Sequence, residues 1–317
     1  MQNNKIFISL ASYQDPMLLF TLNDAVARAS APELLRFGVV DQNISDQRGI
    51  IDELPFSRHV RYTHLHPQDT LGVSWARNLV FSLYDGEDYL LQIDSHTCFE
   101  PGWDNELREQ YARLLDQSGR PIISTYPYAF EMVRGTPRYM RYEAKTVVVL
   151  RPHTESTLSE NNVVLRFSGR HQFSEVHVPG CHLAAGFIFC SGRFIEDVPY
   201  DPYLYFHGEE QSLSVRAYTR GWDIFHPANV PLYHLYKPEN TPLTTHHWHS
   251  DIDTQRSFHS GYLLERSSAR LYALFCGSGL SGAYGLGTIR SLDSFIEFSG
   301  IDYKTKVIRT PAEGTLF

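Results

Sequence analysis

Strand-like and helix-like segments alternate through the first 126 residues of this chain, and this alternation limits its possible folds more than any other feature. Short apolar runs typical of buried strands occur at 5–10, 35–40 and 60–65, in a run that ends at Asp94, and at 121–124. Helices are expected after Asp15-Pro16, at 74–84 with Ser74 as the cap, and at 103–115. Because strands that alternate with helices form βαβ units, the sequence predicts the α/β class with a largely parallel sheet.

The pattern changes in the second half of the chain. Two apolar segments, 146–150 and 162–167, are expected to form antiparallel strands on either side of a polar loop. A later helix is expected over 208–221, where it ends at a glycine, and from about residue 241 the chain becomes more polar and mostly helical. A length of 317 residues allows one large or two small domains. Since there is no repeat or low-complexity linker, we expect one compact domain with an appended tail.

The bulk composition argues against several classes of protein. A formal charge of −8 disfavours broad binding to nucleic acid or to an anionic membrane surface. The N-terminus leads straight into the first strand without a signal-type apolar run, and no stretch approaches the roughly 18–20 apolar residues of a membrane helix. The four cysteines show no CxxC spacing and are expected to be reduced. We therefore expect a cytoplasmic protein without a membrane span.

A carboxylate and an imidazole stand two residues apart where the fourth predicted strand ends. Successive strand residues point to opposite faces, so Asp94 and His96 share one side. Ligands of an open α/β sheet bind outside the carboxyl ends of its strands, and these two groups supply half of a divalent-metal site. A solvated strand end is the alternative, because a chain with 15 histidines contains such pairs by chance.

A third metal ligand is available downstream. His234 lies in the apolar and aromatic run 231–236, where a lone histidine is more often a satisfied core residue. Together with Asp94 and His96 it would leave positions for phosphate oxygens and water. Mixed carboxylate, imidazole and phosphate ligands suit Mn²⁺ or Mg²⁺.

Other charged residues indicate a diphosphate ligand and a second substrate. Arg77 lies near the start of the 74–84 helix, whose free N–H groups favour an anion, although a solvated helix face also explains it. Glu209 and Glu210 begin the later helix. One acid there complements the helix dipole, whereas a pair flanked by aromatic residues suggests a cleft wall that orients hydroxyl groups or acts as a base. We interpret the tract 246–249 (HHWH) as surface, or as a mobile lid over the donor.

Taken in order, these segments resemble glycosyltransferases of the GT-A fold. The closest likeness is the GlcNAc-transferase family that contains cytoplasmic polypeptide hydroxyproline α-GlcNAc-transferases. It runs over nearly the whole chain and is weakest at 131–180 and 238–260. It is carried by ISLASYQDP at 8–16, SWAR at 74–77 and QIDSH at 92–96, and by segments at 86–89, 99–104, 123–127, 206–210, 221–223 and 284–288.

The resemblance implies a domain organisation. A Rossmann-like GT-A domain would occupy residues 1–240, with a nucleotide-binding half at 1–126 and an acceptor half at 127–240. Residues 241–317 would form a helical extension within the same compact unit.

The resemblance also implies site residues by position. Asp94-Ser95-His96 stands where such enzymes keep a DxD-type motif, here as DxH, and His234 looks like the later third metal ligand. Glu209 and Glu210 match the acidic pair that faces the acceptor and are the expected catalytic residues. The residues expected to bind the donor are Ser9, Ala11, Tyr13, Asp15, Arg77, Ser95, Ala185 and Gly186.

The activity implied by the resemblance is metal-dependent transfer of a sugar, most simply GlcNAc, from a UDP-sugar to a hydroxyl group on a protein or glycan. The family is retaining, whereas an inverting route would use one glutamate as a base, and the sequence leaves this choice open. Two other functions remain as alternatives: a metal-dependent nucleotide-sugar hydrolase or pyrophosphatase, and a non-catalytic nucleotide-sugar-binding module. The resemblance says least about the identity of the acceptor, because the middle of the chain departs from the family pattern.

Overall fold

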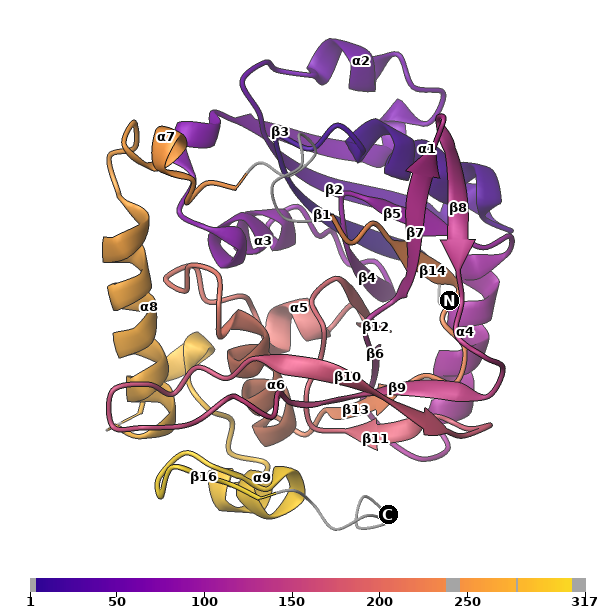
Figure 1. Cartoon of the computed structure of the whole chain (residues 1–317). Helices are drawn as coiled ribbons and strands as arrows, with labels where there is room; N and C mark the ends of the chain where they lie inside the picture. The colour runs from indigo at the N-terminus through magenta and orange to yellow at the C-terminus, as the bar shows by residue number, and fades with distance from the viewer. Residues whose placement is uncertain (1–3, 238–245, 278, 310–317) are drawn as a thin grey trace.

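A mixed eight-stranded sheet forms the centre of the computed structural model, which describes residues 4–237, 246–277 and 279–309 (Figure 1). The strand order is β11-β13-β6-β12-β4-β1-β2-β3. Its parallel half contains β1 (Ile6–Tyr13), β2 (Leu35–Gln42), β3 (Val60–Leu65) and β4 (Tyr89–Asp94). The helices between these strands are α1 (Leu18–Arg28), α2 (Arg48–Asp52) and α3 (Val73–Phe81). This half has the predicted βαβ organisation, and it places the carboxyl ends of β1 and β4 side by side, with Ala11 opposite Asp94.

Antiparallel strand pairs occur in the second half of the sheet. Strand β12 (Phe187–Ser191) lies antiparallel between β4 and β6 (Pro121–Ser124). Strand β13 (Asp223–His226) pairs in parallel with β6, and β11 (Val178–Gly180) closes the edge. The associated helices are α4 (Trp103–Leu114), α5 (Phe194–Asp197) and α6 (Glu209–Thr219).

A smaller sheet brings a late segment back to the end of β4. It contains, in spatial order, β5 (Thr97–Phe99), β14 (Leu232–His234), β7 (Tyr128–Val133) and β8 (Thr136–Met140). Because β14 runs antiparallel to β5 with His234 opposite Thr97, the imidazole of His234 arrives next to that of His96. A separate two-stranded ribbon is formed by β9 (Thr146–Pro152) and β10 (Phe167–Phe173).

Three local predictions differ from the structure. The strand predicted at 162–167 is wrong: β9 pairs instead with β10, because the apolar side chains of Val163 and Leu165 are buried in a core cluster with α6 and α8. Strand β1 continues to Tyr13, three residues beyond the predicted end at residue 10. Helix α3 is capped at Gly72, which has a φ of 107°, and not at Ser74, whose hydroxyl donates instead to the carbonyl of Asp201.

The C-terminal segment packs against the second half of the chain. It contains α7 (Ser250–Asp253), α8 (Ser260–Phe275) and α9 (Leu292–Ser299), and a short hairpin of β15 (Ile301–Asp302) and β16 (Val307–Ile308). Figure 1 shows α8 and α9 on the same side of the molecule as α6, away from α1 and α2. Leu271 and Phe295 share a buried cluster with Leu165 and Val215, so this segment completes a core that the preceding residues begin. Among the described helices, none combines the length and apolarity needed to cross a membrane.

Candidate active site

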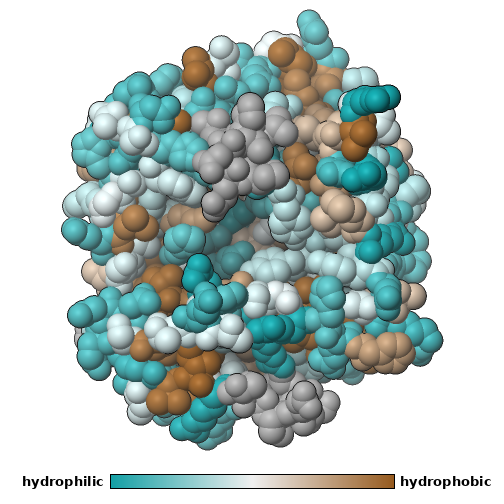
Figure 2. All heavy atoms as spheres, viewed as in Figure 1, coloured by the Kyte–Doolittle hydropathy of each residue, from teal (hydrophilic) through white to brown (hydrophobic). Residues whose placement is uncertain are grey.

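A cavity of about 620 Å³ opens beside the carboxyl ends of β1 and β4. Figure 2 shows a hollow near the centre of this face, with hydrophilic residues visible at its depth. Its lining includes most of the predicted site residues: Ala11, Tyr13, Asp15, Arg77, Asp94, Ser95, His96, Gly186, Glu209, Glu210 and His234. Ser9 and Ala185 are buried outside this lining and are joined through Gln92, which accepts from the Ser9 hydroxyl at 2.9 Å and donates to the carbonyl of Ala185 at 3.3 Å.

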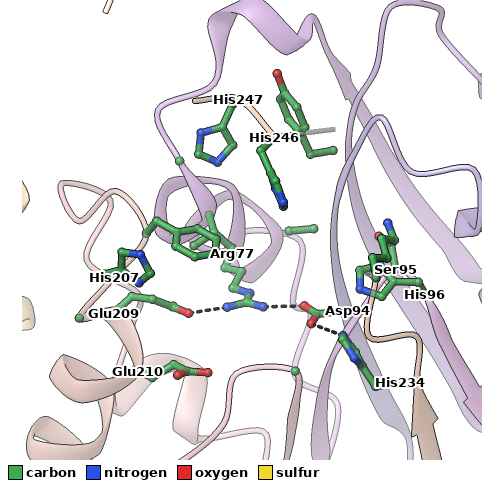
Figure 3. A pocket seen from close by; sticks show the side chains of 18 of the residues that line it. Arg77, Asp94, Ser95, His96, His207, Glu209, Glu210, His234, His246 and His247 are labelled. Carbon is green, nitrogen blue, oxygen red and sulfur yellow. Dashed lines mark hydrogen bonds and ion pairs between the residues drawn. The ribbon is translucent and has the colours of Figure 1, made fainter. Parts of the chain in front are cut away.

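Three potential metal ligands meet at one wall of the cavity. Asp94, His96 and His234 each offer one ligand atom, and these three atoms lie within 4.8 Å of one another. Nε2 of His234 is 3.1 Å from Oδ2 of Asp94, and the two imidazole rings are 4.6 Å apart between centroids. Figure 3 shows the three side chains on neighbouring strands and the loop after β4. One carboxylate and two imidazoles form a donor set that fits a divalent transition-metal ion.

Asp15 holds the loop that carries His96. Its Oδ2 accepts from the Ser95 hydroxyl at 2.7 Å and from Nζ of Lys237 at 3.0 Å, and lies 2.5 Å from Nδ1 of His96. Burial raises the pKa of Asp15, but His96 and Lys237 outweigh that effect and hold the pKa well below its usual range. A carboxylate at Nδ1 fixes that nitrogen as the protonated one, which leaves Nε2 of His96 available as a metal ligand.

One arginine joins the metal-binding wall to the acidic pair. The guanidinium of Arg77 on α3 donates to Oδ1 of Asp94 at 2.7 Å and to Oε1 of Glu209 at 2.6 Å (Figure 3). Burial raises the pKa of Asp94, yet the hydrogen bond with His234 and the charge of Arg77 leave it well below the ordinary value. Arg77 was predicted to contact the nucleotide; it lines the cavity, but two of its nitrogens are occupied by carboxylates.

Glu209 and Glu210 occupy the first turn of α6 and have different environments. Glu209 is buried against Arg77, and its Oε2 has no hydrogen-bond partner among the described residues. Burial raises the pKa of Glu209 above its ordinary value, Arg77 offsets part of that rise and Glu210 adds to it. Glu210 is half-buried, and its Oε1 accepts from the backbone N–H of Ala185 at 2.7 Å. Residues 185–186, which were predicted from the sequence to bind the donor, and the acidic pair are therefore in direct contact.

Two further polar groups of the cavity lining lack a hydrogen-bond partner in the part of the chain that the structure describes. The hydroxyl of Tyr13 and Oε1 of Gln42 are buried and have no hydrogen-bond partner among the described residues. The ring of Tyr13 meets that of His247 edge to face, with centroids 5.3 Å apart. Buried polar atoms are nearly always paired, so unpaired ones on a cavity wall indicate a polar ligand.

Several lining residues were not predicted. Lys237, His182 and Gln42 line the cavity, and only Lys237 had a local signal, its position three residues after His234. His246, His247 and Trp248 also line it. His247 is buried with its Nδ1 against the Tyr205 hydroxyl, so this part of the tract interpreted as surface or lid is packed into the wall.

The comparisons with known proteins agree on the fold. The family model described as Glycosyltransferase (GlcNAc) matches residues 5–54 and 51–305. No curated protein matches the chain. Among solved structures, GalNAc-T7 with UDP, GalNAc and Mn²⁺ has a TM-score of 0.57 and 12% identity, covering 93% of this chain and 55% of that one. TarS of S. aureus with UDP-GlcNAc has a TM-score of 0.45 and 13% identity, covering 84% of this chain and 72% of that one. The likeness to GalNAc-T7 confirms the predicted GT-A fold, although this chain spans only about half the length of that protein.

Proposed function

Because the chain belongs to the glycosyltransferase (GlcNAc) family, we propose that it transfers a sugar from a UDP-sugar to a hydroxyl group with the help of a divalent metal ion. The observation that carries this proposal is the convergence of Asp94, His96 and His234 on one wall of the cavity. A cavity of about 620 Å³ lies within the range of sites that enclose small ligands.

Asp94, His96 and His234 are the proposed metal ligands. Mg²⁺ prefers oxygen ligands, whereas Mn²⁺ accepts imidazole and carboxylate together, so we propose Mn²⁺ ahead of Mg²⁺. When bound, such an ion supplies Lewis-acid stabilisation of the negative charge on a departing diphosphate. Asp15 orients His96 for this role.

Two cationic side chains add to that stabilisation. Nζ of Lys237 lies 3.0 Å from Asp15, and Lys237 also lines the cavity, so its charge stands beside the proposed metal site. Arg77 sits between Asp94 and Glu209. Positive charge placed in advance where a diphosphate leaves lowers the barrier to breaking the bond between the anomeric carbon and the phosphate oxygen.

The nucleotide and the sugar are proposed to occupy opposite ends of the cavity. The unpaired polar atoms of Tyr13 and Gln42 would hydrogen-bond the uracil, whose edge offers both donors and acceptors. The solved GalNAc-T7 structure contains UDP, GalNAc and Mn²⁺, and the family is described by GlcNAc, so we propose UDP-GlcNAc as the first donor to test.

We propose retention at the anomeric carbon. The acceptor oxygen would bond to that carbon on the face that the diphosphate leaves, and the acceptor proton would pass to the departing phosphate oxygen. Glu209 and Glu210 would then lie beside the reacting sugar and balance the positive charge on its ring. The acceptor is proposed to be a hydroxyl on a protein or glycan.

A panel of UDP-sugars tests the proposal. Calorimetry should show UDP binding that requires Mn²⁺ and is lost in excess chelator, and Asp94→Ala should abolish it. Mass spectrometry should then detect sugar transfer to added hydroxyl acceptors. The absence of Mn²⁺-dependent UDP binding would overturn the proposal, and release of free sugar at full rate without any acceptor would favour a hydrolase.

A further inference from the structure

A buried histidine faces the acidic pair across the cavity wall. His182 is 2% exposed, lines the cavity, and stacks on Phe167 with ring centroids 3.4 Å apart and an interplanar angle of 3°. Its Nε2 lies 3.7 Å from Oε2 of Glu210, which is beyond hydrogen-bond length. Nε2 has no hydrogen-bond partner among the described residues. Stacking on Phe167 therefore fixes the position of Nε2, although this nitrogen makes no hydrogen bond with the described residues.

The surrounding hydrogen bonds determine which nitrogen of His182 carries the proton. The hydroxyl of Ser214 donates its single hydrogen to the carbonyl of Glu210 at 2.6 Å, and it accepts from the N–H of Leu183 at 3.0 Å. Toward Nδ1 of His182, at 3.3 Å, the Ser214 oxygen can only accept. Nδ1 is therefore the protonated nitrogen.

The neutral ring then presents a bare acceptor to the cavity. Burial lowers the pKa of His182, and the nearby carboxylate of Glu210 only opposes that shift, so the neutral form is favoured. Oε1 of Glu210 is already bonded to the N–H of Ala185, which leaves Oε2 as its free acceptor. Two hydrogen-bond acceptors, Nε2 of His182 and Oε2 of Glu210, thus stand 3.7 Å apart on the wall with no donor between them.

We propose that this acceptor pair binds two neighbouring hydroxyl groups of the donor sugar, one donating to each atom, and that His182 is a residue that determines sugar specificity. The inference rests on the proposed function. Hydroxyl groups on neighbouring carbons of a sugar ring can each donate one hydrogen, so together they would satisfy both acceptors. A single serine, threonine or hydroxyproline hydroxyl has one hydrogen and would leave one acceptor unpaired.

The position of the pair also favours the donor sugar over the acceptor. A Cβ atom on Gly186 would lie 2.9 Å from Oδ2 of Asp94, so the backbone here runs directly against the proposed metal ligands. The preceding residue, Ala185, holds Glu210. A sugar attached to a diphosphate at the metal site would therefore extend over Gly186 toward the acceptor pair.

The test compares UDP, UDP-GlcNAc and the 3-deoxy and 4-deoxy analogues of UDP-GlcNAc by calorimetry in Mn²⁺. The wild type should bind at least one deoxy analogue about three- to tenfold more weakly, as expected for one lost hydrogen bond. In His182→Phe, which keeps the stack on Phe167, UDP should bind as in the wild type. The affinity for UDP-GlcNAc should fall by a similar factor, and the difference in affinity between UDP-GlcNAc and that deoxy analogue should disappear.

Further variants keep the proposal falsifiable. Glu210→Gln would turn an N–H toward His182 and satisfy it, so this variant should also lose deoxy penalties, and it answers the question if His182→Phe does not fold. His207→Phe changes another histidine of the cavity lining, and this variant should still bind the deoxy analogues more weakly than UDP-GlcNAc. Equal weakening of UDP and UDP-GlcNAc, or penalties that persist in both His182→Phe and Glu210→Gln, would overturn the site. A wild type that binds no UDP-sugar would instead overturn the proposed function.

Discussion

At the residue scale, the site is dominated by one guanidinium shared between two carboxylates. Arg77 is 5% exposed and contacts both Asp94 and Glu209. Ion pairs of this kind add little net stability as wholes, but losing one partner leaves the others charged and buried. Arg77 therefore maintains the arrangement of both acids before any substrate binds.

Replacing Arg77 should cost far more stability than replacing an exposed arginine. Arg77→Ala should lower the free energy of unfolding by about 3–5 kcal/mol, because the buried Glu209 loses its only ion-pair partner among the described residues and the partly exposed Asp94 loses one of two. Arg113→Ala removes an exposed contact with Glu109 at 3.9 Å, and it should change the free energy of unfolding by about 0.5 kcal/mol or less. Urea unfolding measures both, and similar values for the two variants would show that Arg77 has no such role.

Asp15 gives a second prediction at this scale. Asp15→Ala removes the carboxylate that orients His96 while leaving the three proposed ligands in the chain. The affinity for Mn²⁺ should fall about 10- to 100-fold, as is common when the partner of a metal-binding histidine is removed. Titration of the protein with Mn²⁺ by calorimetry checks this. An unchanged affinity would show that Asp15 does not orient His96 for metal binding.

At the element scale, the sequence predicted what is local and missed what depends on distant pairing. The bounds of β3 and β6 were predicted to the residue, although only β6 is a buried apolar run. Asp94 and His96 were proposed as a pair because they are close in sequence: Asp94 ends β4 and His96 lies in the loop directly after it. The approach of His234 depends on β14 pairing with β5, and that of His182 on the insertion of β12, which no local pattern specifies. The error at 162–167 has the same origin, since an apolar run can fill a core without forming a strand.

The start of α3 provides a test at this scale. Gly72 has a φ of 107°, and a Cβ there would lie 2.1 Å from the carbonyl oxygen of Tyr205, which accepts from the N–H of Val73. Gly72→Ala should therefore displace α3, lower the melting temperature and weaken UDP binding through Arg77. Gly86→Ala is the matched control, because φ is 79° but no atom lies within 4 Å. Its cost should be only the conformational strain of about 1–2 kcal/mol. If both variants melt alike, the contact with Tyr205 has no importance.

At the scale of the whole molecule, several groups with a depressed pKa share one response to acid. Burial lowers the pKa of His226 to about 4, and the neutral ring contacts the carbonyl of Ser124 and accepts from the N–H of Leu150. Burial also lowers the pKa of His177 to about 4. The pKa of Asp94 lies below its ordinary value. In each case the unfolded chain takes up protons at a pH where the folded protein does not.

The part of the stability that these groups supply should therefore fall below about pH 6.5, the ordinary pKa of histidine, whereas the raised pKa of Glu209 acts in the opposite direction. Because the folded pKa of His226 is depressed, its contribution is complete above pH 6.5 and is lost as the pH falls toward 4. At pH 5 this amounts to about 2 kcal/mol for the fully buried His226. Asp94 adds to the loss once the pH drops below the ordinary carboxyl range. Urea unfolding of the wild type and of His226→Gln at pH 7 and pH 5 isolates this contribution, and the same pH dependence in both proteins would contradict the assignment.

The double contact of Arg77 has a consequence for how the two ends of the site communicate. A cation that engages Asp94 competes with the guanidinium for the same carboxylate and leaves more of its charge to Glu209. Occupancy at one end thus alters affinity at the other, and thermodynamic reciprocity requires the same factor in both directions. The strength of this coupling between the two ends is then a property of a single side chain, and a change at position 77 would remove it.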